Sequence, residues 1–310
     1  RPSGRTGFVD KKDLCLAHPK GGIMNIDVLS FGRLAYRVFE EVGQDARVVL
    51  DDEGKNLVLR KIAGECEKDL KVFKGNLKKQ GYISEVKSVL SEFAQYGVDF
   101  ERLDDFMKEV PPESYLHYKL DDIRTIYEKF EEYLSEKYIT KEEMLDVLSD
   151  AVPYSDILKG SVVAMDGFTG FTPVQNRLIG ELFSVCEKVM ITVTMDGREN
   201  PYVYEHPYQI FALGKQMVTS LMKIAGEKKT EIEEPICLFE RPVYRFRDCS
   251  EMAFLETELF RYSGAKYNGS CESVSLHEVR SPGKEAKYVA ESIRRLVRTK
   301  GYRYRDIAVI

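Results

Sequence analysis

The sequence lacks several signatures that would assign it to a well-defined class. No apolar run approaches the ~20 residues that cross a bilayer, and residues 1–13 hold no apolar stretch of a signal peptide. The six cysteines are scattered without a CxxC pair, and the four histidines have no other metal ligand at suitable spacing. We therefore expect a reduced cytoplasmic protein without a membrane segment, a disulfide framework or a metal site.

Two catalytic motifs are also absent. The chain contains no GxxxxGK[ST] loop, with which P-loop NTPases hold phosphate groups. It contains no GxSxG motif, which presents the nucleophile of an α/β-hydrolase. ATP hydrolysis by this chain alone is therefore not expected.

The composition is that of an ordinary globular protein, with 43% hydrophobic and 31% charged residues. A length of 310 residues suffices for about two domains. The net charge of −5 is unevenly distributed: residues 99–150 hold 16 acidic and 7 basic side chains, whereas residues 272–310 hold 5 acidic and 9 basic ones. The overall charge therefore does not exclude nucleic acid as a ligand.

The hydrophobic pattern alternates between strands and helices, which predicts an α/β fold with a mostly parallel sheet. From residue 51 to about residue 155 the pattern is helical throughout and predicts an all-helical insertion. Ser30, and Thr140 together with Glu143, have the spacing of helix caps. Strands are expected at residues 23–31, 162–165, 188–195, 273–278 and 306–310, with a short one within 231–246. Further helices are expected at residues 32–42, 174–186, 207–226, 251–263 and 284–300, and residues 1–22 are expected to be loop.

The most informative stretch is residues 161–176, SVVAMDGFTGFTPVQN. Asp166 follows an apolar strand that is expected to be buried. Open α/β sheets place ligand-binding residues at this position, and P-loop NTPases place a metal-binding aspartate there. The next residue is Gly167, whereas a working helicase has a second carboxylate there to activate water. Asp166 is therefore expected either to mark a vestigial nucleotide site or to cap the following turn.

Phe168 and Phe171, next to Thr172, lie in the glycine-rich loop after that aspartate. Aromatic rings at the carboxyl edge of a sheet can stack on the bases of a single strand. The alternative is that the two rings fill the hydrophobic core beneath the loop. The sequence leaves both interpretations open.

A second aromatic group surrounds Arg33, with Phe31 before it and Tyr36 after it, at the expected strand-to-helix corner. A guanidinium group there can bind phosphate or the edge of a guanine while the rings stack. Surface helices also carry arginine without any such role. The Arg- and Tyr-rich residues 294–306 allow the same two interpretations.

Four stretches together resemble one family closely. They are GGIMNIDVLSFGRLAYRVFEEVG, VVAMDGFTGFTPVQ, KVMITVTMD and EAKYVAESIRRLVRTKGYRYRDIAVI. In this order they look like the AddB (RexB-type) subunit of bacterial AddAB helicase–nucleases, from about residue 21 onward. The LSFGRLAYRVF and DGFTGFTP segments are the specific ones, whereas the last stretch is shared with UvrD-like superfamily 1 helicases.

The resemblance implies a RecA-like parallel sheet of the superfamily 1 helicase type, interrupted by a helical insertion. Domain 1A would comprise residues 1–50 and 160–245, and the helical domain 1B residues 51–159. Residues 246–271 would form a connector helix, and residues 272–310 the start of a second α/β domain, 2A. The apolar final residues IAVI form an expected strand without a partner, so the chain is expected to be part of a longer protein.

The resemblance also implies a function. AddB-type subunits work with AddA in ATP-dependent processing of DNA double-strand breaks for recombination, and their helicase region scans single-stranded DNA for the Chi sequence. Their helicase motifs are degenerate, and ATP with Mg²⁺ and an iron–sulfur cluster belong to complete family members, outside this chain. We expect no cofactor and no catalysis in this chain, with an AddA-type subunit and single-stranded and duplex DNA as partners and no membrane.

Particular residues carry the expected DNA contacts. Phe31 and Arg33 match DNA-contacting positions of the family, and Tyr36 stands where many members have tryptophan. The loop DGFTGFTP supplies the other candidates. The expected DNA-binding residues are Phe31, Arg33, Tyr36, Phe168, Phe171 and Thr172, and Asp166 is the expected vestige of the nucleotide site.

Two other functions stay open. The chain could belong to an active superfamily 1 helicase that is truncated before its phosphate loop, although Gly167 argues against this. It could also be a scaffold that docks AddA through the acidic helices of residues 51–159.

Overall fold

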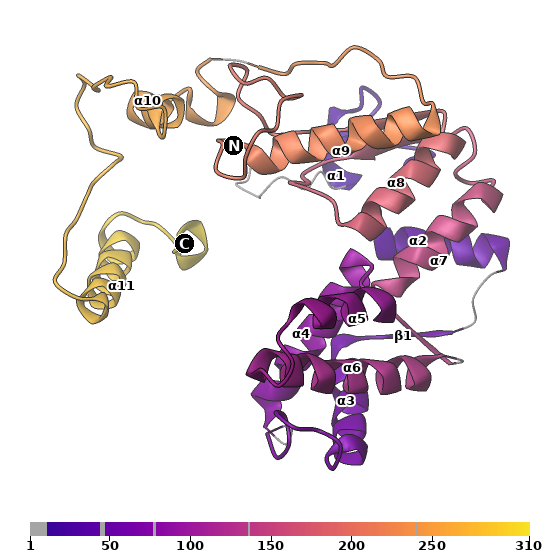
Figure 1. The fold of residues 1–310 in the computed structure, drawn as a ribbon. Coiled ribbons are helices and arrows are strands. Elements are labelled where there is room, and N and C mark those ends of the chain that lie inside the picture. The colour runs from indigo at the N-terminus through magenta and orange to yellow at the C-terminus, as the bar shows by residue number, and fades with distance from the viewer. Residues whose placement is uncertain (1–10, 44–46, 77–78, 136, 240) are drawn as a thin grey trace. The chain divides into compact units, whose positions relative to one another are not determined.

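A computed structural model describes residues 11–43, 47–76, 79–135, 137–239 and 241–310 (Figure 1). The chain divides into two compact units, Arg1–Pro235 and Ile236–Ile310. Helices dominate, and the described strands form two small parallel sheets, each in the first unit. The expected α/β class is therefore confirmed, whereas a RecA-like sheet stays a prediction.

The first unit contains a bundle of four helices that forms the lower part of Figure 1. Helix caps begin three of them: Asp51, Asp99 and Ser114 accept the backbone N–H group three residues further on. Apolar side chains at helical spacing meet inside the bundle, among them Leu59, Ile62, Ile83, Leu103 and Ile126, each about 1% exposed. The helices are α3 (Asp52–Cys66), α4 (Gln80–Tyr96), α5 (Phe100–Glu109) and α6 (Tyr115–Leu134).

The expectation of helix throughout residues 51–155 is wrong at one point. Strand β2 (Tyr138–Thr140) follows α6 and pairs in parallel with β1 (Val48–Leu50), in the register Val49 to Ile139. Three residues are too few to show the two-residue period of a strand. Both strands were therefore missed.

The capping pair expected at Thr140 is confirmed. The Thr140 backbone N–H donates to the Glu143 carboxylate at 2.7 Å, and the Glu143 N–H donates to the Thr140 hydroxyl at 3.2 Å. Helix α7 (Glu143–Ala151) begins there and continues into the short 3₁₀ helix η1 (Val152–Tyr154).

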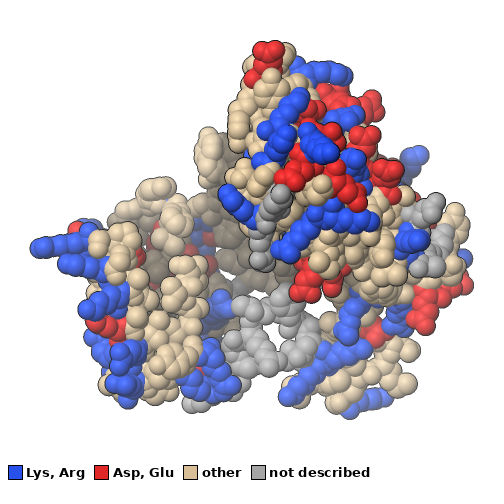
Figure 2. All heavy atoms as spheres, turned by 90° about the horizontal axis from the view of Figure 1, so that it is seen from below, with Lys and Arg blue, Asp and Glu red and all other residues tan. Residues whose placement is uncertain are grey.

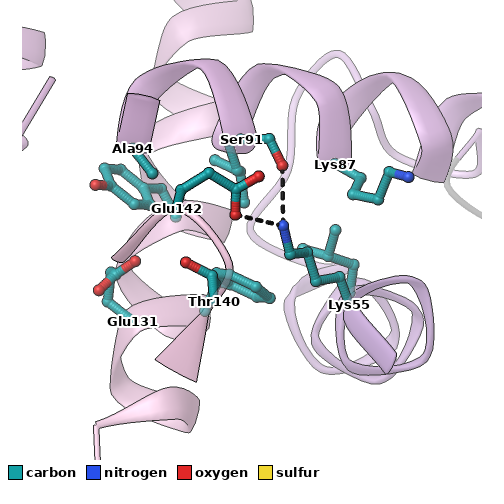
Figure 3. Close-up of a pocket in the computed structure, with 11 residues that line it drawn as sticks. Lys55, Lys87, Ser91, Ala94, Glu131, Thr140 and Glu142 are labelled. Atoms are coloured by element: carbon teal, nitrogen blue, oxygen red, sulfur yellow. Dashed lines mark hydrogen bonds and ion pairs between the residues drawn. The ribbon is translucent and has the colours of Figure 1, made fainter. Parts of the chain in front are cut away.

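A buried ion pair joins the bundle to the start of α7 (Figure 3). Lys55 on α3, with its side chain only 3% exposed, donates to Glu142 at 2.6 Å and to Ser91 on α4 at 3.2 Å. Beside it, Glu131 on α6 shares a hydrogen bond with Glu143, and burial together with this second carboxyl raises the pKa of Glu131 to about 7. Because Glu131 can hold a proton near neutral pH, its repulsion with Glu143 is reduced, and the two carboxyl groups can link the bundle to α7.

The rest of the first unit is a layered α/β core. Strands β3 (Val162–Met165) and β4 (Lys188–Ile191) pair in parallel through α8 (Pro173–Val185), a βαβ unit. Helix α7 packs on α2 (Phe31–Val42) and on α8, and α8 also packs on α9 (Ala212–Lys228). The fully buried side chains of this core include Ala35, Val38, Leu148, Leu178, Ile179 and Leu182.

Helices of this core confirm the sequence pattern better than its strands do. Ser30 caps α2, as expected, and α8 lies within one residue of its expected bounds. Helix α9 begins at Ala212 rather than at residue 207. A short helix, α1 (Lys11–Ala17), lies where loop was expected, and residues 1–10 lie outside the described part.

The expected strand at residues 23–31 is wrong. Asn25 has a left-handed backbone with φ 60°, and Met24 is 86% exposed. No strand pairs with this segment in the described part of the chain, so its alternating pattern has no hydrogen-bonding partner. The segment instead leads into α2 through the cap at Ser30.

The expectation that β3 is buried is also wrong for one of its faces. Val162 is 56% exposed and Ala164 is exposed, and within the strand only Met165 is buried. β4 ends at Ile191 rather than at residue 195, and its Met190 is 43% exposed. Side chains of this two-stranded sheet stay exposed in both strands. The apolar composition of the two strands therefore overestimated how far their side chains are buried.

The second unit contains two helices, α10 (Ser250–Glu258) and α11 (Pro282–Thr299), and the 3₁₀ turns η2 (Tyr244–Phe246) and η3 (Tyr304–Asp306). Helix α11 begins after the Ser281 cap and confirms the expected helix, while α10 ends earlier than expected. The strands expected within 231–246 and at 273–278 and 306–310 are wrong: residues 231–239, 241–246, 273–278 and 306–310 form no paired strand. Apolar residues of these segments, such as Val309 at 70% exposure, are therefore exposed to solvent.

Asp122 on α6 holds the connection between α3 and α4. Asp122 is only 1% exposed. Its carboxylate oxygens accept the backbone N–H groups of Lys71, Val72 and Phe73 at 2.8, 2.7 and 2.8 Å. Hydrogen bonds to a charged group contribute ~1.5–3 kcal/mol each, more than neutral ones. This carboxylate therefore fixes the loop that closes the bundle.

Replacement of Asp122 by alanine is expected to reduce the stability of the bundle by about 3 kcal/mol, because three amides lose their acceptor. Hydrogen exchange of the amides of residues 71–73, measured alongside thermal unfolding, would report it. The matched control is Asp121→Ala, which removes a surface ion pair to Lys71 (2.9 Å) and is expected to cost at most ~1 kcal/mol. Equal effects of the two substitutions would contradict the assignment.

Candidate nucleic-acid interface

Three phenylalanines meet at the carboxyl end of β3. The ring of Phe31, the first residue of α2, lies 5.6 Å from that of Phe168, which in turn lies 5.0 Å from Phe171. All three are partly buried and pack against the α/β core. The two sequence groups are thus brought together. The rings cover the core and keep part of their surface open, and stacking on bases stays a prediction.

The loop that carries two of these rings is fixed at both ends. Gly167 has φ 80°, a conformation that a residue with a Cβ rarely adopts, and it turns the chain as β3 ends. At the other end, the Thr172 hydroxyl accepts the Gln175 N–H at 3.3 Å, and the Gln175 side chain accepts the Thr172 N–H at 2.9 Å. This capping box, with Pro173 as the first helical residue, begins α8.

Arg33 and Tyr36 are exposed on α2, next to the Phe31 ring in sequence. Tyr36 is 57% exposed. Within the described residues the Arg33 guanidinium makes no hydrogen bond or ion pair, whereas Arg37, one turn further on, pairs with Asp27. Arg33 therefore has no internal partner in the described part of the chain, whereas the charge of Arg37 is matched by Asp27.

Asp166 is exposed and joins the ends of the two strands. The Thr192 hydroxyl, just after β4, donates to the Asp166 carboxylate at 2.5 Å, and the Gly167 N–H donates to the same hydroxyl at 3.4 Å. Across the described residues no three His, Cys, Asp or Glu side chains are grouped to hold a metal ion. The aspartate therefore has a structural partner, one that the sequence did not reveal.

A cavity of about 370 Å³ opens at the same edge. Phe168 and Thr169 line it from the loop after β3, and Val193 and Thr194 from the segment after β4. The third wall is the segment before α9 and its first turn, including Phe211. Sequence reasoning missed this wall because residues 207–226 carry a continuous helical pattern that hides the turn before Ala212.

The basic end predicted from composition belongs to the second unit, on the left of Figure 2, where blue side chains outnumber red ones among mostly tan residues. Elsewhere on the face shown, basic and acidic side chains are interspersed. Just before η3 one of the arginines is engaged internally: Arg303 binds Asp306 through its backbone N–H and its guanidinium at 2.8–3.0 Å, which lowers the pKa of Asp306 to about 2. The tail is thus only partly available to a polyanion.

Comparison with known proteins assigns the sequence that forms this site to a family. The family model described as "ADDB, N-terminal" matches residues 5–256. The chain belongs to the AddB N-terminal family. This confirms the resemblance on which the expected interface rests, whereas the contacts of the individual residues stay predictions.

Curated relatives are named as the B-type subunit of an ATP-dependent helicase/deoxyribonuclease. The protein of Lachnoclostridium phytofermentans is 40% identical over 97% of this chain, and that of Thermoanaerobacter sp. is 36% identical over 97%. The protein of Clostridium acetobutylicum is 31% identical over 98%. In each case the match covers 26% of the relative's length, so the chain spans about a quarter of these AddB-family proteins. No helix in the described part is both long and apolar enough to span a membrane.

Thr172, one of the expected DNA-binding residues, has its hydroxyl engaged in the capping box. Thr172→Ala is expected to destabilise the protein by about 1 kcal/mol, because α8 loses an N-cap. Thr172→Ser should restore the stability, and Thr169→Ala in the same loop, which is exposed, should leave it unchanged. Thermal unfolding measures all three. A Thr172→Ala variant as stable as the parent would show that the Thr172 cap does not stabilise α8.

Proposed function

We propose that this chain is the helicase-like region of an AddB-type subunit and that it binds single-stranded DNA at the carboxyl edge of β3 and β4 without hydrolysing ATP. The observation that carries the proposal is the joining of Phe31, Phe168 and Phe171, with an exposed Arg33 on the same helix as Phe31 that has no partner within the described residues. Rings that stack on bases, next to a cation that binds phosphate, are how proteins hold single strands.

The roles within this interface follow from exposure. Arg33 would bind a phosphate oxygen or a guanine edge, and Tyr36, the most open ring, would stack on a base. Phe168 and Phe171 would contact the bases with the parts of their rings that are not buried against the core. Because one counterion is released for each phosphate that is neutralised, affinity should fall as salt rises.

Catalytic inactivity is supported by the residues at the strand ends. Asp166 is followed by Gly167, so no second carboxylate is placed to activate water, and its own carboxylate accepts the Thr192 hydroxyl. The proposed role of the loop is therefore to hold DNA at a vestigial nucleotide site. The sequence it would read is Chi.

The proposal extends to the complete protein and its domains. The βαβ unit β3–α8–β4 would be part of a RecA-like domain 1A (residues 1–50 and 160–245), with 1B at 51–159, a connector at 246–271 and the start of 2A at 272–310. The relatives' name, which makes them one subunit of an ATP-dependent helicase/deoxyribonuclease, supports an AddA-type partner that supplies the motor. The name also supports a DNA substrate. The role that we propose for the complete protein is double-strand break repair by recombination, in the cytoplasm.

Arg33→Ala, made in the complete protein, is expected to weaken single-stranded DNA binding by ~1–3 kcal/mol and to reduce the salt dependence by about one phosphate contact. Fluorescence anisotropy of a labelled oligonucleotide at several salt concentrations measures both quantities. Arg37→Ala is the matched control, because that arginine lies on the same helix and already pairs with Asp27. Unchanged affinity for Arg33→Ala, or equal losses for both variants, would refute the role of Arg33.

A further inference from the structure

The cavity between the loop after β3 and the start of α9 is not used by the proposed contacts of Arg33 and Tyr36. We infer that it receives one unstacked nucleobase of the bound strand, an inference that rests on the proposed function. Its volume of about 370 Å³ falls within the ~300–1,000 Å³ of small-molecule pockets. Phe168 belongs both to its wall and to the three-ring cluster, so the cavity continues the interface.

The lining favours a neutral, flat ligand. Two aromatic rings, Phe168 and Phe211, form part of the wall, and none of the lining residues carries a charge. A phosphate group would therefore find no cation inside and would stay outside. The hydroxyls of Thr169 and Thr194 have no hydrogen-bond partner within the described residues, so they are available to the polar edge of a base.

Phe211 is held in a conformation that its side chain disfavours. Its φ of 59° and ψ of 26° lie in the left-handed region, which bulky residues rarely adopt. Its carbonyl accepts the Lys215 N–H at 3.0 Å, which begins α9 directly after it. Such strain persists where the surroundings impose it and is concentrated at binding sites.

The surroundings that impose it are visible. Lys215, 4% exposed on α9, pairs with Glu199 at 2.6 Å and so ties the helix to the segment after β4. The Gln209 side chain accepts the N–H groups of Glu205 and His206 at 2.9 and 3.3 Å. The wall that carries Phe211 is thus braced before any ligand binds, as a preorganised pocket requires.

The test uses the complete protein and oligonucleotides in which a single abasic residue is moved along the strand. For the parent protein one position, apart from the one whose base stacks on Tyr36, is expected to lower the affinity by at least ~5-fold, the effect of losing one stacked base. Phe211→Asn removes the ring with a residue that tolerates a positive φ, and Leu213→Trp, at a site 63% exposed, fills the cavity from its rim. Both variants should abolish this position dependence.

Phe106→Asn is the control, because this phenylalanine is 57% exposed on α5, in the bundle. It should keep the position dependence of the parent. A flat abasic profile for the parent, or a profile that both variants retain, would overturn the base pocket while the Arg33→Ala effect still upholds the interface. Absence of both the profile and the Arg33→Ala effect would overturn the proposed function itself.

Discussion

The contact between Phe31 and Phe168 is the constraint on which the proposed interface depends. It joins the first turn of α2 to the loop after β3, two segments that lie far apart in the sequence, with ring centroids 5.6 Å apart. Aromatic pairs at such distances contribute ~0.5–1.5 kcal/mol beyond the area they bury. Arg33 and Tyr36 follow on the same helix, so this contact fixes the helix that carries the cation and the open ring relative to the loop.

The parallel pairing of β3 and β4 provides the edge on which this contact is built. Their carboxyl ends are tied together by Asp166 and Thr192, and the chain after β4 returns to α9 through the braced turn at Phe211. The described residues at this edge carry aromatic rings and hydroxyls, and Asp166 is the carboxylate that directly follows β3. This geometry is compatible with the proposed binding of DNA at the edge.

The sequence predicts local structure well where it depends on residues that are close together in the chain. The helices of the bundle, the cap at Ser30 and the reciprocal pair of Thr140 and Glu143 need only side chains that are close in sequence. Strands are predicted less well because they depend on a distant partner. β3 lies at its expected residues, whereas residues 23–31 have the pattern and no partner in the described part of the chain. β1 and β2 have a partner and too few residues for a pattern. The site is predictable as a set of candidates. The spacing of Thr172 and Gln175 already indicates a cap, which the prediction missed, whereas the turn at Phe211 became visible only in three dimensions.

Photocrosslinking tests most directly whether single-stranded DNA lies at this edge. A single-stranded oligonucleotide with photoreactive thymines would be crosslinked to the complete protein, and the modified peptides identified by mass spectrometry. We predict modified residues within 31–36 and 168–172, the two segments that the Phe31–Phe168 contact joins. Crosslinks confined within this chain to the α3–α6 bundle or to residues 236–310 would contradict the account.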